Sequence, residues 1–103
     1  MIQLRVCRTD EVAPGELRGF DVDGLAVPVM IANVDGTFYA ATSMCPHEDV
    51  SLLGGSRHGT IIVCPGHAYE FDLRDGRCGH TDKLRLKTYR VRIVGNELFI
   101  RVL

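Results

Sequence analysis

Apolar and polar residues alternate along much of this chain, as they do in half-buried β-strands. The segments 88–94 and 97–102 alternate, and so does the segment 2–7, where Ile2, Leu4 and Val6 face opposite to Gln3, Arg5 and Cys7. No window of eleven residues has a helical period. The pattern predicts strands near residues 2–7, 17–22, 25–34, 37–41, 60–63, 69–72, 88–94 and 97–102.

Tight-turn signals separate these strands. Asp-Gly pairs occur at residues 23–24, 35–36 and 75–76, and Gly95-Asn96 provides a fourth signal. Such pairs adopt the positive φ angles that two-residue hairpins require. The chain is therefore predicted to be all-β, as an antiparallel sandwich or small barrel.

Size and charge narrow the function classes. The 103 residues fit a single domain, 1–103. The net charge of −1 argues against a nucleic-acid partner, and the longest apolar run, residues 25–32, is too short to span a membrane. No signal peptide is visible at the N-terminus, so the cytoplasm is the expected location. In that reducing compartment the four cysteines suggest metal or redox chemistry.

Two short boxes concentrate the metal-binding residue types. "CPHEDV", residues 45–50, is followed by "CPGH", residues 64–67, which offers the ligands Cys45, His47, Cys64 and His67. A Cys₂His₂ set fits tetrahedral zinc, although zinc fingers usually pair cysteine with cysteine and histidine with histidine. Mixed boxes suit a binuclear site, in which each loop gives a thiolate to one iron and an imidazole to the other.

The stretch 45–72 resembles the cluster-binding segment of Rieske-type [2Fe–2S] ferredoxins. It has the spacing Cys-x-His, sixteen residues, then Cys-x-x-His, with Leu52, Gly55, Gly59 and Ile62 at matching places. The resemblance implies that Cys45 and Cys64 bind the inner iron and that His47 and His67 bind the outer one. It also implies the Rieske fold, an antiparallel sandwich of small sheets with a cluster-binding subdomain of two loops at about 42–72.

Departures from the high-potential members of that family narrow the subclass. Those proteins carry a disulfide beside the cluster, and this chain has Val50 and Gly66 at the corresponding places. They also hydrogen-bond the cluster through a serine and a tyrosine, where this chain has Tyr69 and Phe71. Fewer hydrogen bonds to sulfur imply a low potential, roughly −150 mV.

By resemblance, the protein is expected to be an electron carrier and not itself an enzyme. Ferredoxins of this kind pass single electrons from a flavin-containing NAD(P)H reductase to a terminal oxygenase that acts on aromatic compounds. One alternative is an electron-transfer subunit of another redox enzyme, such as the small subunit of nitrite reductase. Another is a zinc-stabilised interaction module. A monomer is expected.

The remaining cysteines, histidines and charged residues give weaker indications of function. Cys7 and Cys78 match no ligand position and are expected to be a semi-buried strand thiol and a loop thiol, while His58 and His80 are expected to be solvated. Acidic residues near the boxes either form a solvated face or attract a basic partner; they are Glu48, Asp49, Glu70 and Asp72. Basic residues dominate the segment 77–92.

Overall fold

This computed structural model describes residues 2–47, 49–66 and 68–102. These ranges contain nine β-strands and two 3₁₀ turns. The larger sheet has the order β1 (Gln3–Arg8), β9 (Glu97–Arg101), β8 (Thr88–Val94), β4 (Thr37–Thr42), β3 (Val29–Val34) and β2 (Leu17–Phe20). The smaller sheet has the order β5 (Ser56–His58), β6 (Ile61–Val63) and β7 (Glu70–Asp72), and the turns are η1 (Thr9–Glu11) and η2 (Leu52–Gly54). The strand pairs are antiparallel, which confirms the predicted all-β class. No helix in these ranges is long and apolar enough to cross a membrane.

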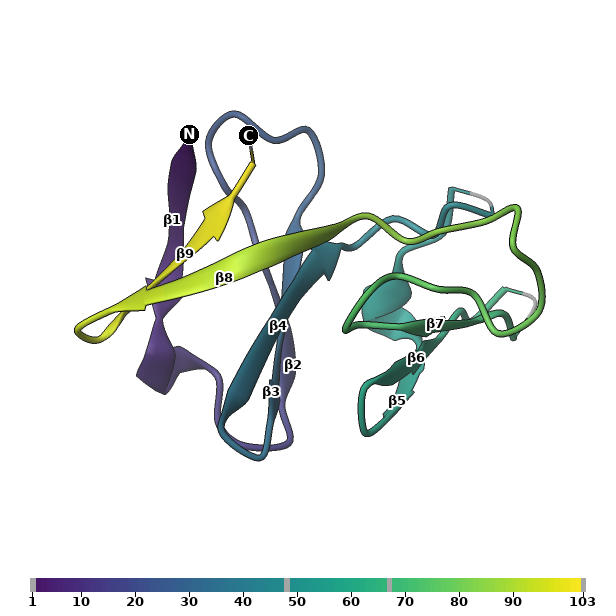
Figure 1. Cartoon of the computed structure of the whole chain (residues 1–103), viewed down its shortest axis with the longest axis horizontal. Helices are drawn as coiled ribbons and strands as arrows, with labels where there is room; N and C mark the ends of the chain where they lie inside the picture. The colour runs from purple at the N-terminus through teal and green to yellow at the C-terminus, as the bar shows by residue number, and fades with distance from the viewer. Residues whose placement is uncertain (1, 48, 67, 103) are drawn as a thin grey trace.

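The larger sheet folds back on itself, so that β1 and β9 lie against β3 and β4 (Figure 1). Strand β8 links the two halves through the pairs Ala40–Tyr89 and Ala41–Thr88. Buried side chains from both layers, such as Val6, Ile31 and Leu98, form the first core. The apolar face of each layer thus covers that of the other, as the alternating pattern predicts.

Strand β3 is buried on both of its faces. Val29 and Ile31 belong to the first core, whereas Met30 and Ala32 belong to a second core on the opposite face. None of the four side chains is more than 1% exposed. A strand between two cores has no polar side, which explains why β3 reads as an almost continuous apolar run.

The second core joins the smaller sheet to the larger one. Leu52 of η2, Ile62 of β6 and Phe71 of β7 are fully buried in it, against β3. At the edge of the smaller sheet, the guanidinium of Arg57 donates a 2.6 Å hydrogen bond to the carbonyl oxygen of Gly15, in the turn before β2. Apolar packing and this bond together fix one sheet against the other.

The segment 43–87, which contains the smaller sheet, leaves and rejoins the larger sheet at adjacent points. Strand β4 ends at Thr42 and β8 begins at Thr88. The amide of Thr42 donates to the carbonyl oxygen of Lys87 at 3.0 Å. The segment forms a lobe of its own at one end of the molecule (Figure 1).

One predicted hairpin turn is confirmed in detail. Asp35 and Gly36 connect β3 to β4 with φ angles of 53° and 91°. Positive φ at both central residues is the type I′ geometry, which matches the twist of the flanking strands.

Three predictions about the strands are wrong. The Asp23-Gly24 turn lies inside a loop of residues 21–28, so the strand predicted at 25–34 begins only at Val29. A bulge in β1 shifts the register between Arg5 and Cys7, and Val6 and Cys7 are therefore both buried rather than on opposite faces. The segment 52–58, for which the pattern predicts no element, forms η2 and β5.

Burial makes Cys7 an unreactive thiol. The side chain is 1% exposed, and this burial, with the charge of Glu11 as a smaller cause, raises the pKa of the thiol to about 11. At pH 8 the reactive thiolate should then be roughly 100-fold scarcer than for an ordinary cysteine. We expect a disulfide reagent to label the folded holoprotein first at the partly exposed Cys78. The rapid labelling phase should disappear in C78S and persist in C7S; its loss in C7S would contradict this assignment.

The same pKa has a consequence for stability at alkaline pH. The Cys7 pKa is raised above its ordinary value of 9.0, so the unfolded chain loses this proton at lower pH than the folded one. The neutral thiol therefore favours folding fully below pH 9, and this contribution is lost as the pH rises towards 11. The wild-type melting temperature should fall over that range more steeply than that of C7S.

Candidate metal centre

The two Cys/His boxes fold into loops with the same closure. In the first, the amide of Cys45 donates to the carbonyl oxygen of Val50 at 3.0 Å. In the second, the amide of Cys64 donates to the carbonyl oxygen of Tyr69 at 2.8 Å. Each cysteine thus begins a loop that closes five residues later, and both loops lie at the free end of the lobe (Figure 1).

This arrangement brings three of the four predicted ligands together. The thiol sulfurs of Cys45 and Cys64 and a ring nitrogen of His47 all lie within 4.8 Å of one another. The fourth predicted ligand, His67, lies outside the described residues. The spacing of the sequence therefore identifies donors that come from separate loops and converge on one point.

The two thiols lie deep and the imidazole lies nearer the surface. Cys45 and Cys64 are 3% and 1% exposed and belong to the second core. His47 is half-buried, with its Nδ1 atom buried. The half-buried side chains of Val50 and Tyr69 pack against the same core. A metal group held here would therefore have an apolar floor and a histidine side that faces outwards.

Two backbone positions permit this arrangement. A Cβ atom at Gly55 would collide with the carbonyl oxygen of Val63, so glycine allows η2 to lie directly against β6 below the loops. Ala68, in the second loop, has a φ of 58°. This left-handed conformation costs about 1–2 kcal/mol for a residue with a Cβ atom. The surrounding loop holds the strained residue in place.

Sequence reasoning missed an aromatic contact beside the donors. The ring of Tyr69 lies 4.2 Å from that of His47, centroid to centroid, and the ring of His80 meets Tyr69 edge-on at 5.5 Å. His80 is exposed, as predicted, but it also packs on a residue of the site. Nothing in the local sequence indicates this contact, because the loop that carries His80 has no regular period.

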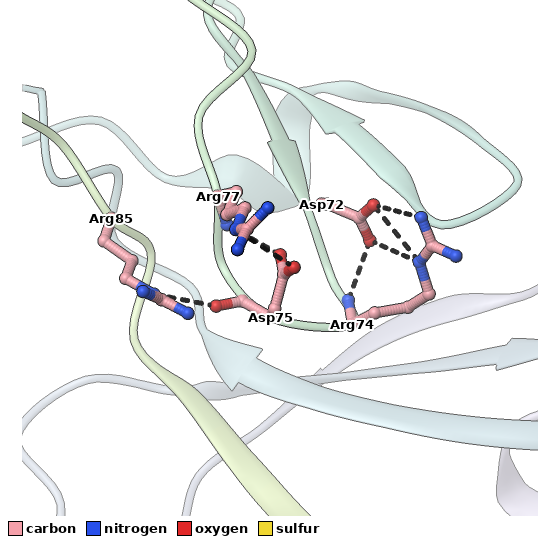
Figure 2. A network of polar contacts seen from close by, with 5 residues as sticks. All are labelled: Asp72, Arg74, Asp75, Arg77 and Arg85. Carbon is pink, nitrogen blue, oxygen red and sulfur yellow. Dashed lines mark hydrogen bonds and ion pairs between the residues drawn. The ribbon is translucent and has the colours of Figure 1, made fainter. Parts of the chain in front are cut away.

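The acidic residues near the boxes differ in their surroundings. Asp49 and Glu70 are exposed, and Glu48 lies outside the described residues. Asp72 is held by Arg74, whose Nη2 donates a 2.7 Å hydrogen bond to Oδ2 (Figure 2). This bond holds the pKa of Asp72 below its ordinary value, and the side chain is only 14% exposed. Asp72 is therefore engaged internally.

The donor chemistry fits an iron–sulfur cluster. Two thiols and an imidazole are ligands that iron–sulfur centres and zinc both accept. Thiols that lie this deep, with a histidine nearer the surface, match a binuclear centre with a thiolate side and an imidazole side. Geometry alone therefore leaves zinc as the competing interpretation.

Comparison with known families separates these interpretations. The family model of the Rieske [2Fe–2S] domain matches residues 3–90. The biphenyl dioxygenase ferredoxin subunit of Pseudomonas sp. (strain KKS102) is 36% identical over 98 residues, which cover 93% of this chain and 88% of that protein.

Solved structures give the same result. The Sphingomonas yanoikuyae B1 ferredoxin superposes with a TM-score of 0.87 at 29% identity, covering 99% of this chain and 100% of the other. A chain in the complex of reduced oxygenase and oxidised ferredoxin of carbazole 1,9a-dioxygenase superposes with a TM-score of 0.85 at 29% identity, covering 96% and 92%.

Proposed function

Because this chain belongs to the Rieske [2Fe–2S] domain family, we propose that it is the ferredoxin component of a multicomponent oxygenase. In this role it carries single electrons from a flavin-containing NAD(P)H reductase to a terminal oxygenase that acts on aromatic compounds. The convergence of Cys45, His47 and Cys64, which come from two separate loops, carries the proposal. The similar proteins named ferredoxin components of oxygenase systems support it.

The proposed ligand set is divided by depth. Cys45 and Cys64 would hold the inner iron of a bound cluster, and His47 with His67 would hold the outer iron. When bound, a [2Fe–2S] cluster with these ligands takes up and returns one electron at a time. The apolar core below the thiols excludes water from the inner side. Tyr69 packs on the His47 ring and helps to fix its orientation.

The rest of the chain supports the two loops of the site and folds with them as a single domain. We assign residues 1–103 to a single Rieske domain in which the segment near 42–72 binds the cluster. Folding of the larger sheet holds β3 and β4 in place, and the second core on β3 positions both loops. The protein acts as a cytoplasmic monomer, and the partner collects the electron at the histidine side.

Electron flow between purified components tests this function. Dithionite-reduced protein should give an electron paramagnetic resonance spectrum with a lower average g value than a four-cysteine cluster. With NAD(P)H, the reductase should reduce the protein, and the substrate-loaded terminal oxygenase should reoxidise it in a stopped-flow experiment. The C64S variant is the control that lacks a complete ligand set. Reoxidation by a nitrite reductase, with none by an oxygenase, would assign the protein to the competing redox system.

A further inference from the structure

A hollow opens on the segment 77–85, next to the metal centre. It has a volume of about 360 Å³ and is lined by Arg77, Cys78, Thr81, Asp82, Leu84 and Arg85. The hydroxyl of Thr81 accepts a 3.1 Å hydrogen bond from the amide of Lys83, which gives its outer turn a defined shape. The half-buried side chains of Cys78 and Leu84 pack against the core that holds the two site thiols. The hollow is thus a part of the same lobe.

Three contacts tie this segment to the metal centre. Cys78 pairs with Phe71 of β7, and the amide of Gly79 donates to the carbonyl oxygen of Glu70 at 2.9 Å. The ring of His80 then meets Tyr69, which itself lies against His47. Residues 78–80 thus lie beside the second box, and a protein that docks over the histidine side comes close to them. Arg77 and Arg85 flank these residues and form a β-bridge with each other.

Asp75 contacts the guanidinium of each arginine of the hollow through a single nitrogen (Figure 2). The Nε of Arg85 donates to the Asp75 carbonyl oxygen at 3.0 Å, and the Nε of Arg77 lies 3.6 Å from Oδ2 of the Asp75 carboxylate. In the described part of the chain, no carboxylate pairs with Arg85, and the Arg77 side chain is 78% exposed. The hydrogen bond orients the Arg85 guanidinium, the ion pair keeps the Arg77 guanidinium near Asp75, and neither contact uses a terminal Nη group.

Available Nη pairs are suited to carboxylates. A guanidinium binds a carboxylate through two parallel N–H donors, and a pre-oriented guanidinium loses less entropy when it does so. Asp82 also lines the hollow and opposes an anion there. The Asp75 carboxylate beside Arg77 opposes an anion as well. Removing an arginine should therefore weaken anion binding at the hollow, and removing the Asp82 charge should strengthen it.

We propose that this hollow receives an aspartate or glutamate side chain of the terminal oxygenase when the two proteins dock. The proposal rests on the function given above and adds a basic contact to a docking face that also carries the exposed Glu70, next to Gly79. The arginines align the partner with the histidine side, and they transfer no electron themselves.

The affinity of the oxidised holoprotein for its terminal oxygenase tests this contact, by titration calorimetry at low salt. R77Q/R85Q should raise Kd by about tenfold, and R77K/R85K, which keeps the charge but loses the planar fork, by about threefold. D82N should lower Kd by about twofold. The matched control is R90Q/R92Q, since Arg90 and Arg92 are also exposed but lie on β8 outside the lobe. This control should change Kd less than twofold. Equal effects of R90Q/R92Q and R77Q/R85Q would overturn the proposal.

A second measurement does not depend on the oxygenase. The redox-inert anion hexacyanochromate(III) broadens amide resonances near its binding site, so it should broaden those of residues 79–85 in the wild type and not in R77Q/R85Q. Broadening on β8 instead, or broadening unchanged by R77Q/R85Q, would show that the hollow binds no anion. If the anion binds here but no complex with the oxygenase forms, the assigned partner is wrong and the anion site stands. The visible spectrum of each variant confirms that its cluster is bound.

Discussion

Replacing Cys64 by serine should give a colourless protein that retains less than about a tenth of the iron and acid-labile sulfide of the wild-type chain. A serine hydroxyl at this buried position is a poor ligand for iron, and no other His, Cys, Asp or Glu of the described residues forms a group with Cys45 and His47. Because metal binding contributes to folding free energy, the variant should also melt well below the holoprotein. Iron and sulfide analysis with a thermal melt measures both effects.

Cys7 provides a matched control for this substitution. Cys7 and Cys64 are equally buried, at 1% exposure, but Cys7 lies in the first core, away from the metal centre. C7S should therefore lose some stability and keep its full iron and sulfide content. If wild-type protein made with ample iron contains one zinc per chain and no sulfide, the centre is a zinc site and the proposed function fails with it.

Substituting alanine for Gly76 should produce the second large effect. A Cβ atom there would collide with the carbonyl oxygen of Leu86, and the φ of Gly76 is 83°. The backbone has little room to move, because Gly76 donates to Asp72 at 2.7 Å and accepts from Leu86 at 2.8 Å. Strain and collision together should cost roughly 3 kcal/mol or more. The substitution should weaken the hydrogen bond between Gly76 and Leu86, which holds the end of the lobe just before β8.

Gly36 isolates the collision from the strain. Its φ is 91°, close to that of Gly76, but a Cβ atom at this position would have no other atom within 4 Å. G36A should therefore cost only the backbone strain, about 1–2 kcal/mol. In a slow temperature ramp, the visible absorbance of the cluster should disappear about 10 °C or more lower in G76A than in G36A. Equal midpoints for the two variants would show that the chain at Leu86 yields to the added methyl group.

Most strands could be predicted, because the alternation of apolar and polar residues within a strand reflects which of its faces is buried. Alternation located the strands at 88–94 and 97–101 almost to the residue. The bulge in β1 was not predictable in this way, since it depends on how Cys7 pairs with Leu98 on another strand. The three-residue strand β5 is likewise too short to have a period, and it forms because β6 supplies its partner.

The candidate metal centre also has a part that the local sequence predicts and a part that depends on contacts between distant segments. The convergence of Cys45, His47 and Cys64 could be predicted from residue type and spacing, because few kinds of side chain bind metals. Tyr69 and His80 could not, since their contact depends on where two loops meet. The hollow at Arg77 and Arg85 was hidden for the same reason, and the linear charge pattern showed only an excess of basic residues there.

The segment 43–87 leaves the larger sheet and returns to it at neighbouring positions. The whole lobe can therefore be exchanged as one unit. Its two ends meet at Thr42 and Thr88, on neighbouring strands of the larger sheet. Insertions or deletions between them can therefore reshape the docking face without altering the register of β4 with β8. A graft needs two adjacent antiparallel strands, an apolar face equivalent to Met30, Ala32 and Ala41, and an acceptor for Arg57 in place of Gly15. Exchanging this one continuous segment should therefore change which partner the protein binds, while the larger sheet stays the same.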